Sequence, residues 1–376
     1  MRADDYALLV GIQRYPGTKL AALQGPCNDV AHFKSWLLDP QGGDIDPQNV
    51  RELITDEPPL APAPALEVFP PTQAQFYALF RSIVFGAGPV PIKRPQGRLY
   101  LFFSGHGFSD LHETTTHAAL YCANAQPGLS LNINGTALAN WCVRAAVFGE
   151  VVLVMDCCRD SEVSKKLDIV PLDAVNDAAG AKKVKKLEIY AVPFAEKAQE
   201  RSFKDLGRPQ GLLTYTLVSA LYGAPLAQMG FGAGAKKGRS GHALKEFLQG
   251  CWPDVAGLDG PDAPEVVLPN TGDICFSVLP PRLVPRRVRL APPVLTPATL
   301  KVVDDAGNDY VVVDLLHAPA MARVTVAGAA PVEQPFDGTE ILLELRPQIY
   351  EARLDAPGAP PRSVLLPTVG DSDVVL

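Results

Sequence analysis

Short apolar runs alternate along the first 280 residues with stretches in which apolar residues recur every three or four positions. The apolar runs are typical of strands buried on both faces of a sheet, and they lie at 6–12, 99–103, 151–155 and 187–192. The spacing between them favours amphipathic helices at 28–38, 73–85, 136–148 and 212–222. Alternating strands and helices predict an α/β domain with a mostly parallel sheet and right-handed crossovers.

The pattern changes near position 280. The stretch 280–285 is rich in proline and predicts a linker, and short β-rich runs separated by turn residues follow between 300 and 366. These runs predict a small all-β, sandwich-like domain, and 345–353 is similar to the tyrosine-bearing strand of transthyretin-like sandwiches. We therefore expect an α/β domain at 1–282, a linker at 283–299 and an accessory or docking domain at 300–376.

The composition and net charge of the chain argue against several classes of function. The chain has 376 residues, of which 47% are hydrophobic and 20% charged, as in a globular protein with a proper core. Its net charge of −7 argues against non-specific binding to nucleic acid. We expect no membrane partner and a cytoplasmic location, because no apolar run has membrane-spanning length and residues 1–5 lack an apolar signal region. Seven cysteines without a C-x-x-C pair indicate neither a zinc knuckle nor a disulfide framework.

Two of the predicted buried strands are followed by residues whose side chains could act in catalysis. The run 151–155 stops at Asp156-Cys157-Cys158, and the run 99–103 stops at Ser104-Gly105-His106-Gly107. Ligands of an open α/β sheet bind outside the carboxyl ends of the strands, so two neighbouring strands would bring His106 and a cysteine together there. A nearby imidazole lowers the pKa of a thiol and accepts its proton, which activates the thiolate as a nucleophile. The pattern predicts a Cys–His peptidase.

These two motifs, in this order, resemble the caspase-like cysteine peptidases of clan CD, family C14, and among them the metacaspases and bacterial caspase homologues. The usual pattern of that branch is S-G-H-G followed by D-[SC]-C-H-S-G, whereas this chain has Arg159-Asp160-Ser161 after its second cysteine. The resemblance implies a caspase-like, mostly parallel six-stranded sheet flanked by helices, and a thiol protease that acts on protein substrates and is made as a zymogen. Bacterial relatives serve in stress or defence programmes, which is an analogy only.

The resemblance also assigns the catalytic roles. Cys158 would be the nucleophile and His106 the general base and acid, in a dyad without a third side chain. Cys157 would then be a buried packing residue, because adjacent side chains of a strand point in opposite directions. The backbone N–H groups of Gly107 and Cys158 would be the oxyanion donors.

An acidic S1 pocket follows from the same resemblance. Asp29, in Gly25-Pro26-Cys27-Asn28-Asp29, would line it together with Ser104 and Asp156. Two carboxylates in a narrow cleft attract a guanidinium or an ammonium group, so we expect cleavage after Arg, and after Lys as second choice. Asp29 has a second explanation as an acid in the first turn of a helix, favoured by the helix dipole, and the two roles are compatible.

Several lysines lie between the nucleophile strand and the next strand, where caspase-like zymogens are commonly cut. They are Lys165, Lys166, Lys182, Lys183, Lys185 and Lys186. If the pocket takes basic residues, the enzyme could cut itself there, or an upstream protease could do so. Equally, the segment could be a solvated loop whose charges serve solubility.

No cofactor or metal is predicted. Many metacaspases need calcium, which takes about six to eight oxygen ligands, but the acids after Cys158 are scattered among lysines, so calcium is left open without a compact cluster. A competing hypothesis is a catalytically silent caspase-fold scaffold that recruits partners through the C-terminal β domain. The altered residues after Cys158 favour it, and retention of both His106 and Cys158 disfavours it. A third hypothesis is another clan CD activity with a different P1 residue.

Overall fold

The chain forms two units in the computed structural model. The first comprises Met1–Leu221 and Leu226–Leu279, and the second Tyr222–Pro225 and Pro280–Leu376. The structure describes residues 2–55, 65–109, 117–159, 167–173, 175–193, 197–203, 206–223, 227–229, 236–257, 260–270, 272–277, 284–304, 307–318, 320–345, 349–367 and 374–376.

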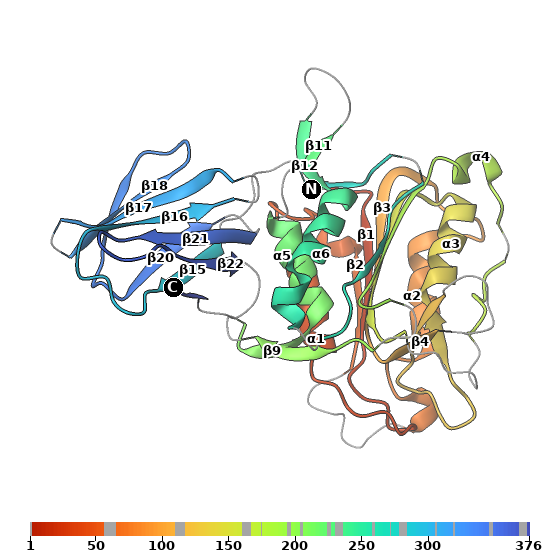
Figure 1. The fold of residues 1–376 in the computed structure, drawn as a ribbon. Coiled ribbons are helices and arrows are strands. Elements are labelled where there is room, and N and C mark those ends of the chain that lie inside the picture. Colours follow the sequence, from red (N-terminus) through yellow and green to blue (C-terminus); the bar gives the residue numbers. More distant parts are fainter. Residues whose placement is uncertain are drawn as a thin grey trace. The chain divides into compact units, whose positions relative to one another are not determined.

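A six-stranded sheet forms the centre of the first unit (Figure 1). In spatial order its strands are β13 (Glu265–Val267), β8 (Lys185–Tyr190), β7 (Phe148–Cys157), β3 (Arg94–Gly105), β1 (Tyr6–Gly11) and β2 (Val50–Ile54). All neighbouring pairs from β8 to β2 are parallel, and β13 is antiparallel to β8. The predicted α/β class, with a mostly parallel six-stranded sheet, is confirmed.

Helices cover both faces of this sheet, as predicted. The helical elements are α1 (Pro26–Leu38), η1 (Pro47–Asn49), η2 (Leu66–Val68), α2 (Gln73–Phe85), α3 (Gly135–Ala145), α4 (Ala178–Ala181), α5 (Leu212–Gly223) and α6 (Gly241–Ala256). Helices α1, α5 and α6 lie on one face, and α2 and α3 lie on the other (Figure 1). Within the described ranges, none of the helices combines the length and the apolar character needed to cross a lipid bilayer.

Alternation along β3 explains why both faces are covered. Side chains at successive positions of a strand point to opposite faces, and β3 is apolar at every position from Leu99 to Phe103. On one face, Phe102 stacks on Phe33 of α1 with ring centroids 4.7 Å apart. On the other, Phe103 contacts Phe76 of α2 at 5.7 Å. The central strands are therefore held from both sides, which fixes where their carboxyl ends lie.

The described residues of the first unit also form three smaller sheets. Their strands are β4 (Gly107–Ser109), β5 (Ala118–Tyr121) and β6 (Asn132–Asn134); β9 (Glu200–Phe203) and β10 (Arg208–Gly211); and β11 (Ala227–Met229), β12 (Lys236–Ser240) and β14 (Cys275–Ser277). β13 forms one edge of the main sheet by pairing with β8, whereas β14 pairs with β12.

The second unit consists of two sheets. They are ordered β20-β15-β23 and β19-β18-β17-β16-β21-β22. Residues from both sheets, such as Val288 and Leu343 of one and Val302 and Val313 of the other, belong to one buried cluster, so the unit is a β-sandwich. Its strands are β15 (Val284–Arg289), β16 (Ala298–Val303), β17 (Asp309–Ala318), β18 (Met321–Val326), β19 (Val332–Pro335), β20 (Glu340–Leu345), β21 (Ile349–Asp355), β22 (Arg362–Pro367) and β23 (Val374–Val375).

The segment 283–299 is not the linker that its prolines suggested. It contributes β15, which pairs with β20 along its whole length and with β23 at Val288 and Arg289. Pro285 is tolerated because β23 does not reach it, so the strand is an open edge on that side at this position. Leu290 and Val294 are buried in the same cluster, so this segment is part of the sandwich.

We expect the stacked pair Phe102–Phe33 to be a main contributor to the stability of the first unit. Phe102 is completely buried, so Phe102→Ala should lower the free energy of unfolding by about 3–5 kcal/mol. Trp36, Trp141 and Trp252 all lie in this unit, so urea unfolding followed by tryptophan fluorescence reports on it. Val90→Ala, at a position 70% exposed, is the control and should change stability by less than about 0.5 kcal/mol. A loss below about 1 kcal/mol for Phe102→Ala would contradict the packing described.

Candidate active site

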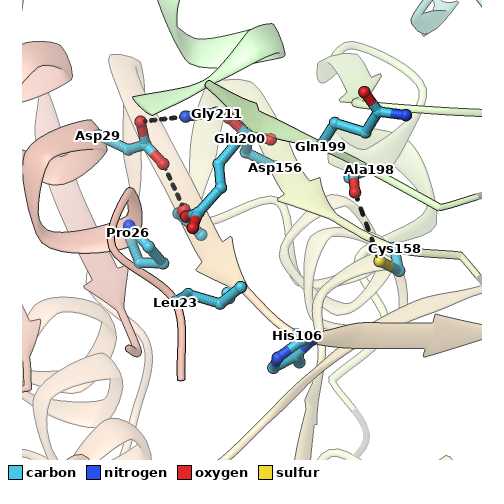
Figure 2. Close-up of a pocket in the computed structure, with 12 residues that line it drawn as sticks. Leu23, Pro26, Asp29, His106, Asp156, Cys158, Ala198, Gln199, Glu200 and Gly211 are labelled. Carbon is cyan, nitrogen blue, oxygen red and sulfur yellow. Dashed lines mark hydrogen bonds between the residues drawn. The ribbon is translucent and has the colours of Figure 1, made fainter. Parts of the chain in front are cut away.

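β3 and β7 deliver the two predicted catalytic side chains to one cavity. Their parallel register pairs Ser104 with Asp156 and Gly105 with Cys157, so the next residues, His106 and Cys158, leave the sheet side by side. Both line a cavity of about 70 Å³ at the carboxyl ends of the strands (Figure 2). The three predicted S1 residues, Asp29, Ser104 and Asp156, line the same cavity.

His106 is oriented by a backbone carbonyl. Its Nε2 lies 2.8 Å from the carbonyl oxygen of Ala21. Because a carbonyl only accepts hydrogen bonds, Nε2 carries the hydrogen, and Nδ1 of the neutral ring is left to accept a proton. Burial lowers the pKa of His106, against the opposing effects of the Ala21 hydrogen bond and of Glu200, so the ring is neutral near pH 7. No sequence pattern signals such a partner, because any residue type supplies a carbonyl.

Tyr15 holds the backbone on which His106 sits. Its hydroxyl accepts a hydrogen bond from the His106 N–H at 2.8 Å and donates one to the Ile12 carbonyl at 3.0 Å. Gly105 has φ of +150°, and a Cβ there would lie 2.4 Å from the Tyr15 hydroxyl, so only glycine fits. The glycine that the sequence showed beside the histidine is therefore required by a tyrosine that the sequence did not single out.

Cys157 and Cys158 differ in exposure as expected for adjacent strand residues. Cys157 is buried and Cys158 is partly exposed in the cavity, with Sγ 3.9 Å from the carbonyl oxygen of Ala198. A Cβ on Gly107 would lie 2.5 Å from the Cys157 sulfur and 2.8 Å from the Cys158 carbonyl oxygen. The backbone of Gly107 therefore runs against that of the two cysteines, which brings together the two segments expected to supply the oxyanion donors.

Two buried carboxylates meet at the N-terminus of α5. Asp29 accepts hydrogen bonds from the Ser104 hydroxyl at 2.7 Å and from the Gly211 N–H at 2.9 Å. Asp156 accepts from the Thr214 N–H at 3.0 Å and from its hydroxyl at 2.6 Å. N–H groups at the start of a helix stabilise such anions. Gly211 separates the two acids, and a Cβ there would lie 2.1 Å from an Asp156 oxygen.

Burial makes these carboxylates easier to protonate. It raises the pKa of Asp156 to about 6, although the Thr214 hydrogen bonds act in the opposite direction. Burial, followed by the negative charge of Asp156, raises the pKa of Asp29 well above its usual value. Asp29 is also in the first turn of α1, so its two proposed locations, helix start and cavity wall, coincide.

Glu200 is a third acid of the cavity that sequence reasoning missed. It begins β9, lines the cavity and accepts hydrogen bonds from the N–H groups of Gln24 at 3.1 Å and Gly25 at 2.7 Å. Figure 2 shows its carboxylate between Asp29 and Leu23. It lies in a polar stretch without any motif, so only the tertiary fold places it here. None of the described residues that line the cavity is a lysine or an arginine.

Arg159, where the caspase-like pattern has histidine, is a buried anchor. Its side chain is 0% exposed, forms an ion pair with Glu265 of β13 and lies over the ring of Tyr190, 4.3 Å from the centroid. It also donates to the Val192 carbonyl oxygen at 3.4 Å. The residue after Cys158 is thus tied to the far edge of the sheet. Asp160 and Ser161, the rest of that departure, lie outside the described residues.

The structure separates the six lysines proposed as activation sites. Lys165 and Lys166 lie outside the described residues. Lys182 and Lys183 are exposed in the turn after α4. Lys185 and Lys186 are in β8, paired with β7, and bind Glu150 and Asn140 respectively. Cleavage after either of the last two would need β8 to leave the sheet, so they are poor sites for a protease that binds an extended, unpaired chain.

Among the described acids that follow Cys158, Asp168 and Asp177 have separate partners. Asp168 accepts from Gln73 and from the Asn132 N–H, and Asp177 caps α4 through the Gly180 N–H. Within the part of the chain that the structure describes, no three His, Cys, Asp or Glu side chains are grouped so that they could hold a metal ion.

Comparison with known proteins adds two structural likenesses. No protein-family model and no curated protein sequence matches the chain. It is similar to the crystal structure of caspase-1 from Spodoptera frugiperda, with TM-score 0.42 and 8% identity over 73% of this chain and 90% of that one. It is also similar to the structure of pro-sf-caspase-1, with TM-score 0.37 and 9% identity over 71% and 91%. At such low similarity neither structure bears on the residues of the site.

We expect Glu265→Ala to destabilise the protein more than Arg159→Met. The first change leaves a buried cation without its carboxylate, which costs about 3–5 kcal/mol. The second removes the cation and leaves Glu265, whose side chain is 38% exposed and can be hydrated. Urea unfolding of both variants checks the order. A larger loss for Arg159→Met would show that the packing of Arg159 on Tyr190 outweighs its ion pair.

Proposed function

We propose that this protein is a caspase-like cysteine endopeptidase that cleaves proteins after Arg, and more slowly after Lys. The observation that carries the proposal is one cavity that holds His106 and Cys158 together with Asp29, Asp156 and Glu200. The thiol and the imidazole supply covalent catalysis, and the acids supply a counter-charge for a cationic side chain.

The reaction follows from the groups around the cavity. Nδ1 of neutral His106 takes the thiol proton of Cys158, and the thiolate attacks the carbonyl carbon of the scissile peptide bond. The N–H groups of Gly107 and Cys158 stabilise the oxyanion. The His106 imidazolium then gives its proton to the leaving amine as the C–N bond breaks, which leaves a thioester on Cys158. Water, deprotonated by His106, hydrolyses the thioester and regenerates the thiol. The Ala21 carbonyl keeps the ring oriented in both directions of proton transfer.

Specificity for a cation follows from the charge of the cavity. Buried carboxylates repel one another and are costly to desolvate, as their raised pKa values indicate. A guanidinium between them relieves that repulsion and donates several hydrogen bonds, whereas an aspartate would add a further negative charge. The planar guanidinium offers more donors than the ammonium of lysine, which is why we place Arg before Lys.

Peptide cleavage tests the proposal. Fluorogenic peptides that differ in the residue before the coumarin should be cleaved fastest with Arg, next with Lys, and at least about 100-fold more slowly with Asp. Cys158→Ala and His106→Ala should each lower kcat/KM by at least about 1000-fold. Glu200→Gln should weaken Arg cleavage by about tenfold, since it removes one counter-charge without changing shape. Preference for Asp would overturn the pocket assignment.

A labelled arginine chloromethylketone separates the peptidase from a silent scaffold. Only an active thiolate is alkylated, so mass spectrometry should find the label on Cys158 and not on Cys157, which is buried. Absence of both labelling and cleavage would favour the scaffold. The buried contacts of Arg159 weaken one part of the sequence argument for that alternative, because this altered residue has a structural role of its own.

The pH dependence of cation binding provides an independent test. With Asp156 near pKa 6, acetyl-arginine amide should bind the Cys158→Ala variant more weakly as the pH falls from 7 to 5, with a midpoint close to 6. Thr214→Val removes a hydrogen bond that favours the ionised form, so it should move the midpoint upward. Asp156→Asn should abolish the midpoint near 6. Isothermal titration calorimetry measures all three, and a flat profile for the Cys158→Ala protein would exclude Asp156 as a counter-charge.

A further inference from the structure

A second cavity lies beside the segment that orients His106. Its volume is about 400 Å³, and it is bounded by 18–20, after β1, and by the loop that joins β5 to β6. The two loops touch: a Cβ on Gly17 would lie 2.5 Å from the carbonyl oxygen of Ala125. The cavity is therefore a fixed feature between two braced loops.

Two residues that line the second cavity, Leu20 and Tyr121, are directly connected to His106 or to its hydrogen-bond partner. Leu20 lines it, and the next residue, Ala21, supplies the carbonyl that binds Nε2 of His106. Tyr121 also lines it and donates its N–H to the His106 carbonyl oxygen at 2.9 Å. Leu23, two residues after Ala21, lines the acidic cavity instead. The two cavities share no lining residue, and the segment 20–23 contributes one residue to each, Leu20 and Leu23.

The chemistry of peptide cleavage indicates which part of the substrate would lie near the second cavity. The side chain before the scissile bond enters the acidic cavity, and His106 must reach the leaving amine to protonate it. The chain that follows the scissile bond therefore starts at His106 and continues away from the acids. The second cavity is within reach of that segment, because Leu20 is next to Ala21 and Tyr121 is bound to the His106 backbone.

We propose that the second cavity is a subsite for the leaving segment of the substrate, and that it binds an apolar side chain within the first three residues after the cleaved bond. This inference rests on the proposed function. The floor is apolar, because Tyr121 and Ala125 are buried there and Leu20 is half-buried. Lys19 is the one charged residue among those described that line it, and it disfavours a lysine or arginine at this position of the substrate.

Two substrates that share the residues up to Arg test this subsite. The first ends in a coumarin amide and has no residues after the cleaved bond. The second is a set of quenched peptides that continue after the cleaved bond. In this set, Gly, Leu, Phe, Asp and Lys are tested in turn at each of the next three positions. At one of these positions, Leu or Phe should raise kcat/KM about tenfold over Gly, as expected for burial of an apolar side chain. Lys should be the poorest residue there, and Lys19→Glu should reverse the order of Asp and Lys.

A matched pair of variants locates the effect. Ser130 lines the second cavity and Leu129 does not, although Leu129 is its neighbour and is 52% exposed. Ser130→Trp should lower the ratio of kcat/KM for the Leu peptide to that for the coumarin substrate by at least about fivefold, and Leu129→Trp should leave this ratio unchanged. Coumarin cleavage with the same ratio in both variants would overturn the subsite and leave the proposed function intact. Failure of the wild-type protein to cleave the coumarin substrate would overturn the proposed function, and the subsite with it.

Discussion

The parallel register of β3 and β7 is the constraint on which the site depends. Because Gly105 is opposite Cys157, the two strands end at the same level, and the residues that follow, His106 and Cys158, enter one cavity. A side chain alternates faces along a strand, so a shift of one residue would exchange Cys158 with its buried neighbour. The register is secured by apolar packing on both faces, where Phe102 meets α1 and Phe103 meets α2. The chemistry of the site thus depends on the core beneath it.

The acidic cavity shows how the fold accommodates charge that it cannot leave in water. Asp29 and Asp156 are nearly completely buried, a costly location for carboxylates, yet each accepts hydrogen bonds from the first residues around α5. Gly211 gives the room for this, since any side chain would collide with Asp156. The remaining cost is visible in the raised pKa values of both acids. A cation bound between the two acids, as in the proposed function, would offset part of this cost.

Local patterns were enough to predict the fold class, and the resemblance to caspase-like peptidases implied the five side chains that meet in the acidic cavity. The apolar runs and helical spacing are short-range signals, and S-G-H-G and Asp156-Cys157-Cys158 stand directly at strand ends. The site residues that were not predicted are those whose hydrogen-bond partners lie far away in the sequence. Ala21 acts through its backbone, Tyr15 through a hydroxyl 91 positions away from its partner His106, and Glu200 through bonds to residues 24 and 25. β15 was missed because the prolines of 280–285 suggested a linker, although the one proline inside this strand, Pro285, lies outside its pairing with β23.

Arg159 connects the end of β7 to the two strands beside it, β8 and β13. Met155, Tyr190 and Glu265 are register partners in a row across β7, β8 and β13, and the Arg159 side chain contacts the last two. The residue directly after Cys158 is therefore held by contacts to β8 and β13, at one side of the sheet. In the proposed mechanism the N–H of Cys158 must keep a constant direction if it is to stabilise an oxyanion. The ion pair and the ring contact of Arg159 hold the backbone next to that N–H, so the residue at the histidine position of the caspase-like pattern has a structural role in this chain.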